Sequence, residues 1–256
     1  MVDLSSNFPG IADEIKGISK FSISRNGIHL GYGLGLLFDS LTKNPSALVY
    51  RARNGITLPF DSEMFRKIYE QYGEFLPRRG EAVVDVGAQY ADYAIICNKL
   101  YGASVTAFEP LRVNFNRALY LIRKNRADVE IHNMGLSDVS ERVGIHSNNY
   151  MLRSDGTGDF SEEVQFVKMD DLNLQPDLLK IDVEGFEMNV LRGATNTISH
   201  CRPRIIIETH SSLLEKGVND FLSAMGYSLK HEFGRIKGEG WMDTVVNLFF
   251  LPKDQL

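Results

Sequence analysis

The chain has little cysteine and no long apolar run, and both absences exclude whole classes of protein. Cys97 and Cys201 are the two cysteines among 256 residues. Two cysteines make neither a disulfide framework nor a zinc site, so we expect a protein of the reducing cytoplasm. No stretch of about 18 apolar residues is present, so no membrane span is expected. Residues 1–20 contain acids and no long apolar core, which argues against a secretory signal.

A concentrated positive charge is also missing. Lys and Arg number 28 against 33 Asp and Glu, which gives a formal net charge of −5. A nucleic-acid partner requires a concentrated basic face, so we expect no such partner. The composition, 43% hydrophobic and 24% charged, is that of an ordinary globular protein with one or two domains. It leaves the oligomeric state open, a homo-oligomer included.

The glycines of a dinucleotide-binding fingerprint are the third absence. Residues 83–87 read Val-Val-Asp-Val-Gly, which is typical of a buried parallel strand that opens into a tight turn. A second apolar run, 105–108, ends at Glu109, where α/β nucleotide-binding folds carry an acid for ribose hydroxyls. Gly87 is the one glycine of the turn after Asp85, so G-x-G-x-x-G does not fit. The frame fits the looser turn under the amino-acid end of S-adenosylmethionine better.

Strands and helices alternate in the sequence from Glu81 onward, which predicts an α/β fold with a doubly wound, mostly parallel sheet. Seven strands are expected, at 82–86, 104–108, 129–134, 178–183, 204–209, 227–233 and 245–251. Helices are expected near 90–100, 112–125, 186–192 and 212–225. Turn residues fill the stretch 139–168, which is too long for a simple crossover and predicts an inserted hairpin or flexible loop.

The first part of the sequence differs from the rest, and we assign residues 1–79 to an N-terminal extension and 80–256 to the main domain. A hairpin is expected at 48–58, because Asn54-Gly55 is the preferred two-residue turn between strands. The other elements expected here are a helix near 11–19, a helix near 63–72 and a Pro/Arg/Gly connector over 75–80.

Four segments in order resemble the FkbM-type methyltransferase family. They are residues 83–88, 107–110, 179–187 and 203–208. The most specific part is Lys-Ile-Asp-Val-Glu-Gly-Phe-Glu at 180–187, followed by Val-Leu-Arg-Gly-Ala at 190–194. The resemblance covers roughly residues 80–210. It implies a class I, Rossmann-like fold, S-adenosylmethionine as cofactor, and methyl transfer usually to a hydroxyl oxygen.

The residues assigned to the cofactor follow the expected strands. They are Asp85, Gly87, Ala88, Gln89, Glu109, Pro110, Met134, Gly135 and Asp182. Asp85 is expected to meet the ammonium of S-adenosylmethionine, directly or through water. Backbone N–H groups after Gly87 would face its carboxylate, because helix starts favour anions. Glu109 offers two acceptor oxygens to the ribose, and Met134 and Gly135 would contact the adenine.

Two positions of the turn depart from the family that the chain resembles. Its members usually have Asn where Gln89 stands and Gly where Ala91 stands. The Gln89 amide can still donate and accept hydrogen bonds. Ala91 adds a methyl group where the backbone normally approaches the ligand closely.

Asp182, Glu184 and His210 are the candidates for the group that removes the acceptor's proton. Asp182 and Glu184 end the fourth expected strand, and Glu208 and His210 share a face at the end of the fifth. Histidine suits this task near neutral pH. The structural alternatives, a helix cap for Glu184 and a structural role for His210, stay open. Two neighbouring acids can bind a divalent cation, but no third ligand is apparent, so no metal is expected.

The sequence therefore predicts a cytoplasmic S-adenosylmethionine-dependent O-methyltransferase. On the resemblance alone, the acceptor is a hydroxyl of a sugar, glycolipid or secondary metabolite. The N-terminal extension and the insertion would form the acceptor pocket, because variable loops carry specificity. One alternative is an NAD-type oxidoreductase, which shares the turn and the strand-end acid but not the further glycines. The other is a non-catalytic binding protein that retains the fold, and Gln89 and Ala91 favour this alternative.

Overall fold

The chain forms two compact units, Met1–Glu63 and Met64–Leu256, each described here by itself. The structure is a computed structural model. It describes residues 21–24, 27–30, 34–38, 48–51, 56–59, 72–148, 151–153, 160–240 and 242–255. The helices expected near 11–19 and over most of 63–72 lie outside the described residues. In the described parts of the chain, no helix is both long enough and apolar enough to cross a membrane.

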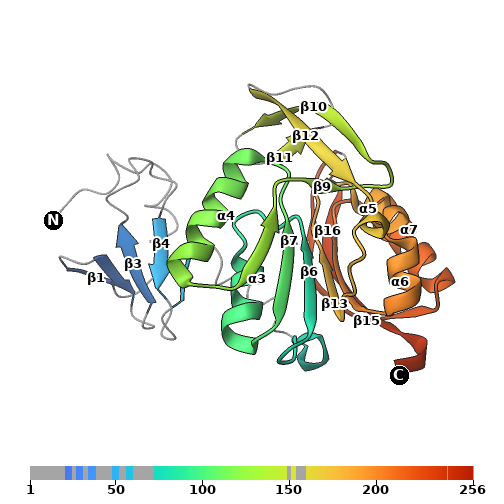
Figure 1. The fold of residues 1–256 in the computed structure, drawn as a ribbon, viewed down its shortest axis with the longest axis horizontal. Helices are drawn as coiled ribbons and strands as arrows, with labels where there is room; N and C mark the ends of the chain where they lie inside the picture. Colours follow the sequence, from blue (N-terminus) through green and yellow to red (C-terminus); the bar gives the residue numbers. More distant parts are fainter. Residues whose placement is uncertain are drawn as a thin grey trace. The chain divides into compact units, whose positions relative to one another are not determined.

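The first unit contains an antiparallel sheet of five strands in sequential order (Figure 1). The strands are β1 Phe21–Ser24, β2 Gly27–Leu30, β3 Leu34–Phe38, β4 Leu48–Arg51 and β5 Thr57–Pro59. In the expected hairpin, Tyr50 of β4 pairs with Leu58 of β5. The sequence predicted only this last pair of strands.

The second unit is built on a seven-stranded sheet in the order β15-β16-β14-β13-β6-β7-β8. The strands are β6 Ala82–Val86, β7 Ser104–Phe108, β8 Val129–His132, β13 Leu178–Ile181, β14 Arg204–Thr209, β15 Tyr227–Lys237 and β16 Thr244–Pro252. Strands β8, β7, β6, β13 and β14 run parallel, whereas β16 pairs antiparallel with β14 and β15. The predicted α/β fold with a mostly parallel seven-stranded sheet is confirmed.

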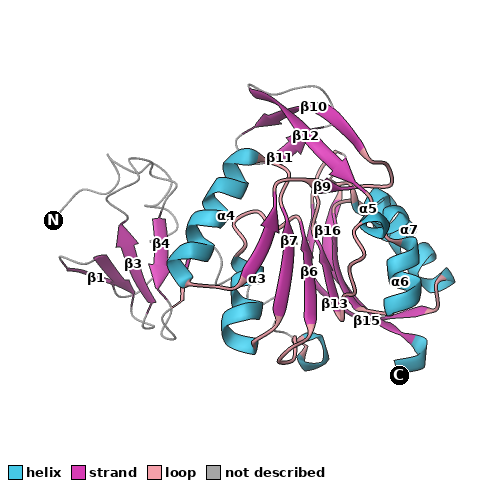
Figure 2. Cartoon of the chain, in the orientation of Figure 1, coloured by secondary structure: helices cyan, strands magenta, loops and turns pink. Residues whose placement is uncertain are grey.

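Five α-helices accompany this sheet in the described part of the unit (Figure 2). They are α3 Asp92–Ile96, α4 Arg112–Asn125, α5 Glu187–Gly193, α6 Thr195–Cys201 and α7 Ser212–Ala224. A π-helical turn, Cys97–Tyr101, continues α3. Apolar residues of α5, α6 and α7 pack in one core with Leu179, Ile181, Ile205 and Ile207 of β13 and β14. The sequence did not predict α6, which begins directly after α5.

A small second sheet lies between β8 and β13 in the chain. Its strands are β9 Gly135–Leu136, β10 Glu141–Asn148, β11 Met151–Arg153 and β12 Phe160–Val167. Strands β10 and β12 pair antiparallel, and β12 pairs parallel with β9. Within the stretch 139–168, the described residues are therefore mostly strand, and residues 149–150 and 154–159 lie outside the description.

Residues 72–79 are grouped with the second unit, Met64–Leu256. Tyr72 and Phe75 pack edge-to-face on Phe249 of β16, with ring centroids 4.9 and 5.1 Å away. Arg204 at the start of β14 donates a hydrogen bond of 2.8 Å to the carbonyl of Glu74. The segment resembled a connector because of its Pro, Arg and Gly, but its aromatic side chains anchor it to the sheet.

Candidate active site

A cavity of about 300 Å³ lies at the carboxyl ends of the central parallel strands. Its lining includes Gly87 after β6, Glu109 after β7, Asp182 after β13, and Glu208 and His210 of β14 and its end. The strand order reverses between β6 and β13, since β7 lies on one side of β6 and β13 on the other. Open α/β sheets bind ligands at such a switch point, and the volume suits a small molecule.

The turn after β6 packs directly against the backbone after β13. Gly87 has φ +79, and a Cβ built on it would lie 1.7 Å from the carbonyl oxygen of Asp182. The N–H groups of Gly87 and Ala88 both donate to the carbonyl of Phe108, at 3.0 and 2.9 Å. A side chain at position 87 would therefore collide with backbone atoms, and the glycine fixes the position of Asp182 beside the turn.

The two positions that depart from the resembled family have left-handed backbone conformations. Gln89 has φ 48, and Ala91, the N-cap of α3, has φ 59. Glycine and asparagine adopt this region more easily than alanine or glutamine, which explains the residues that the family favours here. Ala91 is fully buried, so its methyl group also contributes packing.

We expect Ala91→Gly to change the unfolding free energy by less than about 1 kcal/mol. Relief of left-handed strain gains about 1 kcal/mol, and the loss of a buried methyl and the entropy of glycine each cost about 0.8 kcal/mol. Affinity for S-adenosylmethionine should be equal or tighter, because the methyl group no longer crowds the turn. Urea denaturation and titration calorimetry measure both, and a marked loss of affinity would show that the methyl group packs usefully.

Glu109 connects the glycine turn to the end of β7. Its carboxylate accepts hydrogen bonds from the N–H of Gln89 at 2.8 Å and from the N–H of Leu111 at 2.9 Å. The side chain of Asn114 donates a longer bond of 3.4 Å. Burial raises the pKa of Glu109 to about 7, although these hydrogen bonds lower it. Glu109 is 4% exposed and, with Pro110, lines the cavity, so its carboxylate is held where a ligand can reach it.

The raised pKa of Glu109 predicts a pH dependence of stability. Its pKa in the folded chain is about 7 against an ordinary 4.5, so folding favours the protonated form. This stabilisation is fully present below about pH 4.5 and is lost as the pH rises through about 7. Glu109→Gln, which cannot ionise, should flatten the fall in unfolding free energy between about pH 5 and about pH 8 by on the order of 2 kcal/mol. Urea denaturation of both proteins at both pH values measures the difference, and parallel pH profiles would contradict it.

Asp85 is fully buried beneath the turn and is linked to the cavity by its ion pair with Lys180. The Lys180 ammonium lies 3.2 Å from Asp85 Oδ1 and 3.5 Å from Asp182 Oδ2, and it donates to the carbonyl of Gly87 at 3.3 Å. Burial raises the pKa of Asp85, and the charge of Lys180 opposes this. Lys180 lines the cavity and Asp85 does not. The sequence could not say with which acid Lys180 pairs, and it pairs with two.

The two positions expected at the adenine are separated in the structure. Gly135 lines the cavity, and a Cβ built on it would lie 2.4 Å from the ring of Phe166. Met134 instead packs against the hydrophobic core. Phe166, from β12, stacks on Phe186 with ring centroids 5.8 Å apart, and both rings line the cavity. This aromatic pair was not predicted, because Phe166 lies in the turn-rich insertion.

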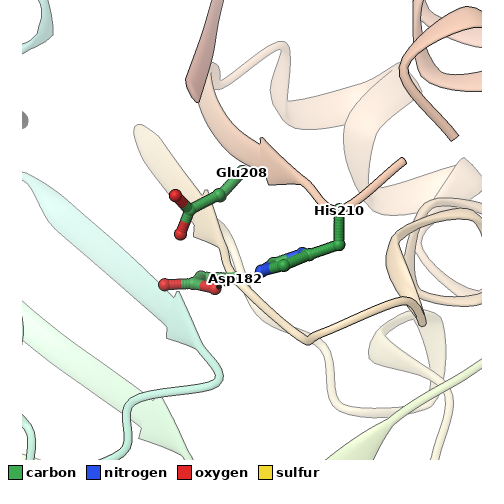
Figure 3. A group of neighbouring side chains, drawn as sticks. All are labelled: Asp182, Glu208 and His210. Atoms are coloured by element: carbon green, nitrogen blue, oxygen red, sulfur yellow. Dashed lines mark ion pairs between the residues drawn. The ribbon is translucent and has the colours of Figure 1, made fainter. Parts of the chain in front are cut away.

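An imidazole and several carboxylates gather at the ends of β13 and β14 (Figure 3). His210 Nδ1 lies 2.7 Å from Glu187 Oε1, and its Nε2 lies 3.8 Å from Asp182 Oδ1. Glu208 accepts a hydrogen bond of 3.0 Å from the side chain of Asn247. One ligand atom from each of Asp182, Glu208 and His210 lies within 4.8 Å of the other two. This possible metal-binding group contains Asp182 but not Glu184, the second acid considered from the sequence, and its other two members are Glu208 of β14 and His210 directly after β14.

Glu187 is the residue of this group that sequence reasoning missed. It is fully buried in the first turn of α5 and accepts from the N–H of Gly185 as well as from His210. Because a carboxylate oxygen only accepts, His210 donates its Nδ1 proton to Glu187, and Nε2 faces Asp182. The available signal was the second acid of Glu-Gly-Phe-Glu at 184–187, a segment that carries the resemblance to the family.

The charges of the group change the expectation for His210. Burial lowers its pKa, but the hydrogen bond with Glu187 and the charges of Glu187, Asp182 and Glu208 raise it to about 9. At neutral pH the imidazole is therefore protonated and is a weaker candidate for the base. Burial raises the pKa of Glu184 to about 7, and burial with the charge of Asp182 raises that of Glu208 to about 8.

Glu184 lines the cavity and does not cap α5. Its backbone has φ 52, and the next residue, Gly185, has φ 107. The N-cap of α5 is Phe186, without a side-chain hydrogen bond, so the helix-cap alternative for Glu184 does not hold. Two successive left-handed residues direct the chain from β13 into α5 along the cavity wall.

The sequence and the fold of this chain are similar to those of known methyltransferases. Residues 85–233 match the family model described as the methyltransferase FkbM domain. Hexuronic acid methyltransferase AglP of Haloferax volcanii is 30% identical over 148 residues, which cover 54% of this chain and 60% of AglP. The structure of methyltransferase FkbM from Methylobacillus flagellatus is similar with a TM-score of 0.54 and 20% identity. That similarity covers 72% of this chain and 47% of the other, so this chain spans about half to three fifths of these relatives.

Proposed function

The chain belongs to the family of FkbM-domain methyltransferases, and we propose that it transfers the methyl group of S-adenosylmethionine to a hydroxyl oxygen of a sugar-type acceptor. One observation carries the proposal. A single cavity gathers the glycine turn, the strand-end acid Glu109 and the carboxylates beside His210. The family favours methyl transfer over the nicotinamide-dependent alternative, for which the turn also lacks the further glycines.

The residues of the cavity fit S-adenosylmethionine. Gly87 lets the turn pack against the carbonyl of Asp182, and residues 87–89 of the turn line the cavity. Glu109 would hold the ribose hydroxyls, because its buried carboxylate keeps lone pairs beyond those used by two backbone N–H groups. When bound, the cofactor supplies an electrophilic methyl group on its sulfonium.

The chain's own task is then to hold the acceptor oxygen in line and to take its proton. Asp182 and Glu184 are the carboxylates of the cavity suited to accept that proton. Lys180 and His210 flank Asp182, at 3.5 Å and 3.8 Å. Glu187 positions His210 through Nδ1. The geometry of the cavity and the order of the strands support these proposed roles.

The acceptor class rests on the similarity to AglP, whose name gives a hexuronic acid as its substrate. A uronic acid offers hydroxyl groups and a carboxylate to the cavity. Mass spectrometry of reactions with S-adenosylmethionine and a panel of uronic acids and neutral hexoses tests the proposal. We expect one added methyl group on a uronic acid, stable to mild alkali as an ether is. An alkali-labile methyl ester would contradict hydroxyl transfer, and cofactor binding without any product would favour the non-catalytic alternative.

Glu109→Ala should weaken S-adenosylmethionine binding by about 1.5–3 kcal/mol, because it removes a charged acceptor of hydrogen bonds. Titration calorimetry measures the affinity. Glu163→Ala, which removes an exposed acid on β12, serves as the matched control and should bind like the wild type. Equal affinities of the two variants would remove Glu109 from the ribose site.

A further inference from the structure

We propose that Asp182, Glu208 and His210 bind one divalent cation in the cavity, on which the oxygen of the methyl acceptor is coordinated. The cation site is inferred from geometry and does not depend on the proposed function. Only the coordination of the acceptor by the cation rests on the proposed function.

The three side chains are close enough for one ion. One ligand atom of each lies within 4.8 Å of the other two, and Asp182 Oδ1 and His210 Nε2 are 3.8 Å apart. Metal–ligand bonds of about 2.1 Å place three ligands of one ion roughly 3.0–3.6 Å from one another. The three ligand atoms therefore need to approach one another by up to roughly 1–2 Å. Figure 3 shows the three side chains close together, with the His210 ring directed toward Asp182.

His210 has a hydrogen-bond partner for its second ring nitrogen, as metal-binding histidines do. Glu187 Oε1 lies 2.7 Å from Nδ1 and is itself held by the N–H of Gly185 at 2.9 Å. A histidine that binds a metal through one nitrogen almost always donates the other N–H to a carboxylate or carbonyl. The fully buried Glu187 thus fixes the ring and leaves Nε2 for the cation. On binding, Nε2 gives up its proton to solvent.

The charges around the cavity also favour a cation. Five of the carboxyl groups in or directly beneath its wall surround Lys180 and His210: Asp85, Asp182, Glu184, Glu187 and Glu208. Among the described residues, the cationic groups that face them are Lys180 and His210. Burying carboxylates in excess of their partners costs free energy, and a divalent cation offsets two of these charges.

Two carboxylate oxygens and one imidazole nitrogen suit Mn²⁺ or Zn²⁺ better than Ca²⁺, which takes oxygen ligands. Three protein ligands leave positions open for an acceptor that presents two neighbouring oxygens, such as a hydroxyl and a carboxylate. The cation lowers the pKa of the coordinated hydroxyl. Its O–H bond breaks with the proton passing to Glu184, the O–CH₃ bond forms, and the S–CH₃ bond breaks with its electron pair returning to sulfur.

Electron paramagnetic resonance of the full chain titrated with Mn²⁺ alone tests the site. We expect one bound Mn²⁺ per chain. Asp182→Asn and Glu208→Gln should each weaken Mn²⁺ binding by at least about tenfold, because replacing even a residue that only hydrogen-bonds to a metal ligand causes a loss of that size. Glu74→Gln is the matched control, because Glu74 also contacts a histidine, His231, but on the surface, and it should bind like the wild type. No binding at millimolar Mn²⁺, or equal binding by all three variants, would overturn the proposal.

Electron spin echo measurements on the wild type do not depend on the folding of any variant. Mn²⁺ bound to His210 should show the nuclear coupling of an imidazole nitrogen, and bound Mn²⁺ without that coupling would contradict the site. Failure of the proposed function has a different signature: Mn²⁺ bound through these ligands, but no methylated product. Methyl transfer at an unchanged rate in excess chelator would instead show that the acceptor does not use the cation.

Discussion

Replacing Gly87 with alanine is expected to destabilise the second unit by more than about 3 kcal/mol and to abolish S-adenosylmethionine binding. The left-handed conformation alone costs alanine about 1–2 kcal/mol. The added Cβ would also lie 1.7 Å from the carbonyl oxygen of Asp182, so one of two backbone segments must move. Because Asp182 follows a strand paired on both sides, neither segment can move cheaply. Urea denaturation and titration calorimetry measure the two effects.

Gly80→Ala separates the two causes. Gly80 has φ +84, but a Cβ built on it would meet nothing within 4 Å. This variant should therefore show the conformational cost of about 1–2 kcal/mol and no loss of cofactor affinity. Similar losses of stability in the two variants would contradict the close approach of the turn to Asp182.

Replacing Asp182 with asparagine should lower single-turnover methyl transfer by about 10²–10⁴-fold, while cofactor affinity changes little. Asparagine keeps the shape of the side chain but neither accepts a proton nor supports the charge between Lys180 and His210. Asp220→Asn is the matched control, because Asp220 is exposed on α7, pairs with Lys216 and does not line the cavity. A turnover within a few-fold of the control would remove Asp182 from the reaction.

The central strands could be predicted closely because each is a short apolar run that ends at a polar residue. The bounds expected for β6, β7 and β14 are those observed. Strand β15 continues to Lys237, beyond the expected end, as an edge strand with irregular pairing to β16. The first three strands of the N-terminal unit were not predicted, because each is only four or five residues long, although β1 and β2 alternate in Phe-Ser-Ile-Ser and Gly-Ile-His-Leu.

The edge of the sheet could be predicted, but the pairing of side chains there could not. Strand-end acids and His210 were expected at one edge because parallel strands end together. The pairs that define the site join residues from different elements, as Lys180 with Asp85 and His210 with Glu187 do. Such pairs depend on which strand lies beside which and on the start of α5. The two partners of such a pair follow no alternation and no fixed spacing in the sequence. A single sequence therefore does not specify these pairs.

The central claim is that one cavity holds the cofactor and the acceptor-side carboxylates together. A crystal structure of the full chain with S-adenosylhomocysteine tests it most directly. We predict the ribose hydroxyls on the carboxylate of Glu109, the amino-acid end at the Gly87 turn, and the sulfur facing Asp182 and His210. Binding elsewhere, or a sulfur directed away from Asp182 and His210, would contradict the account.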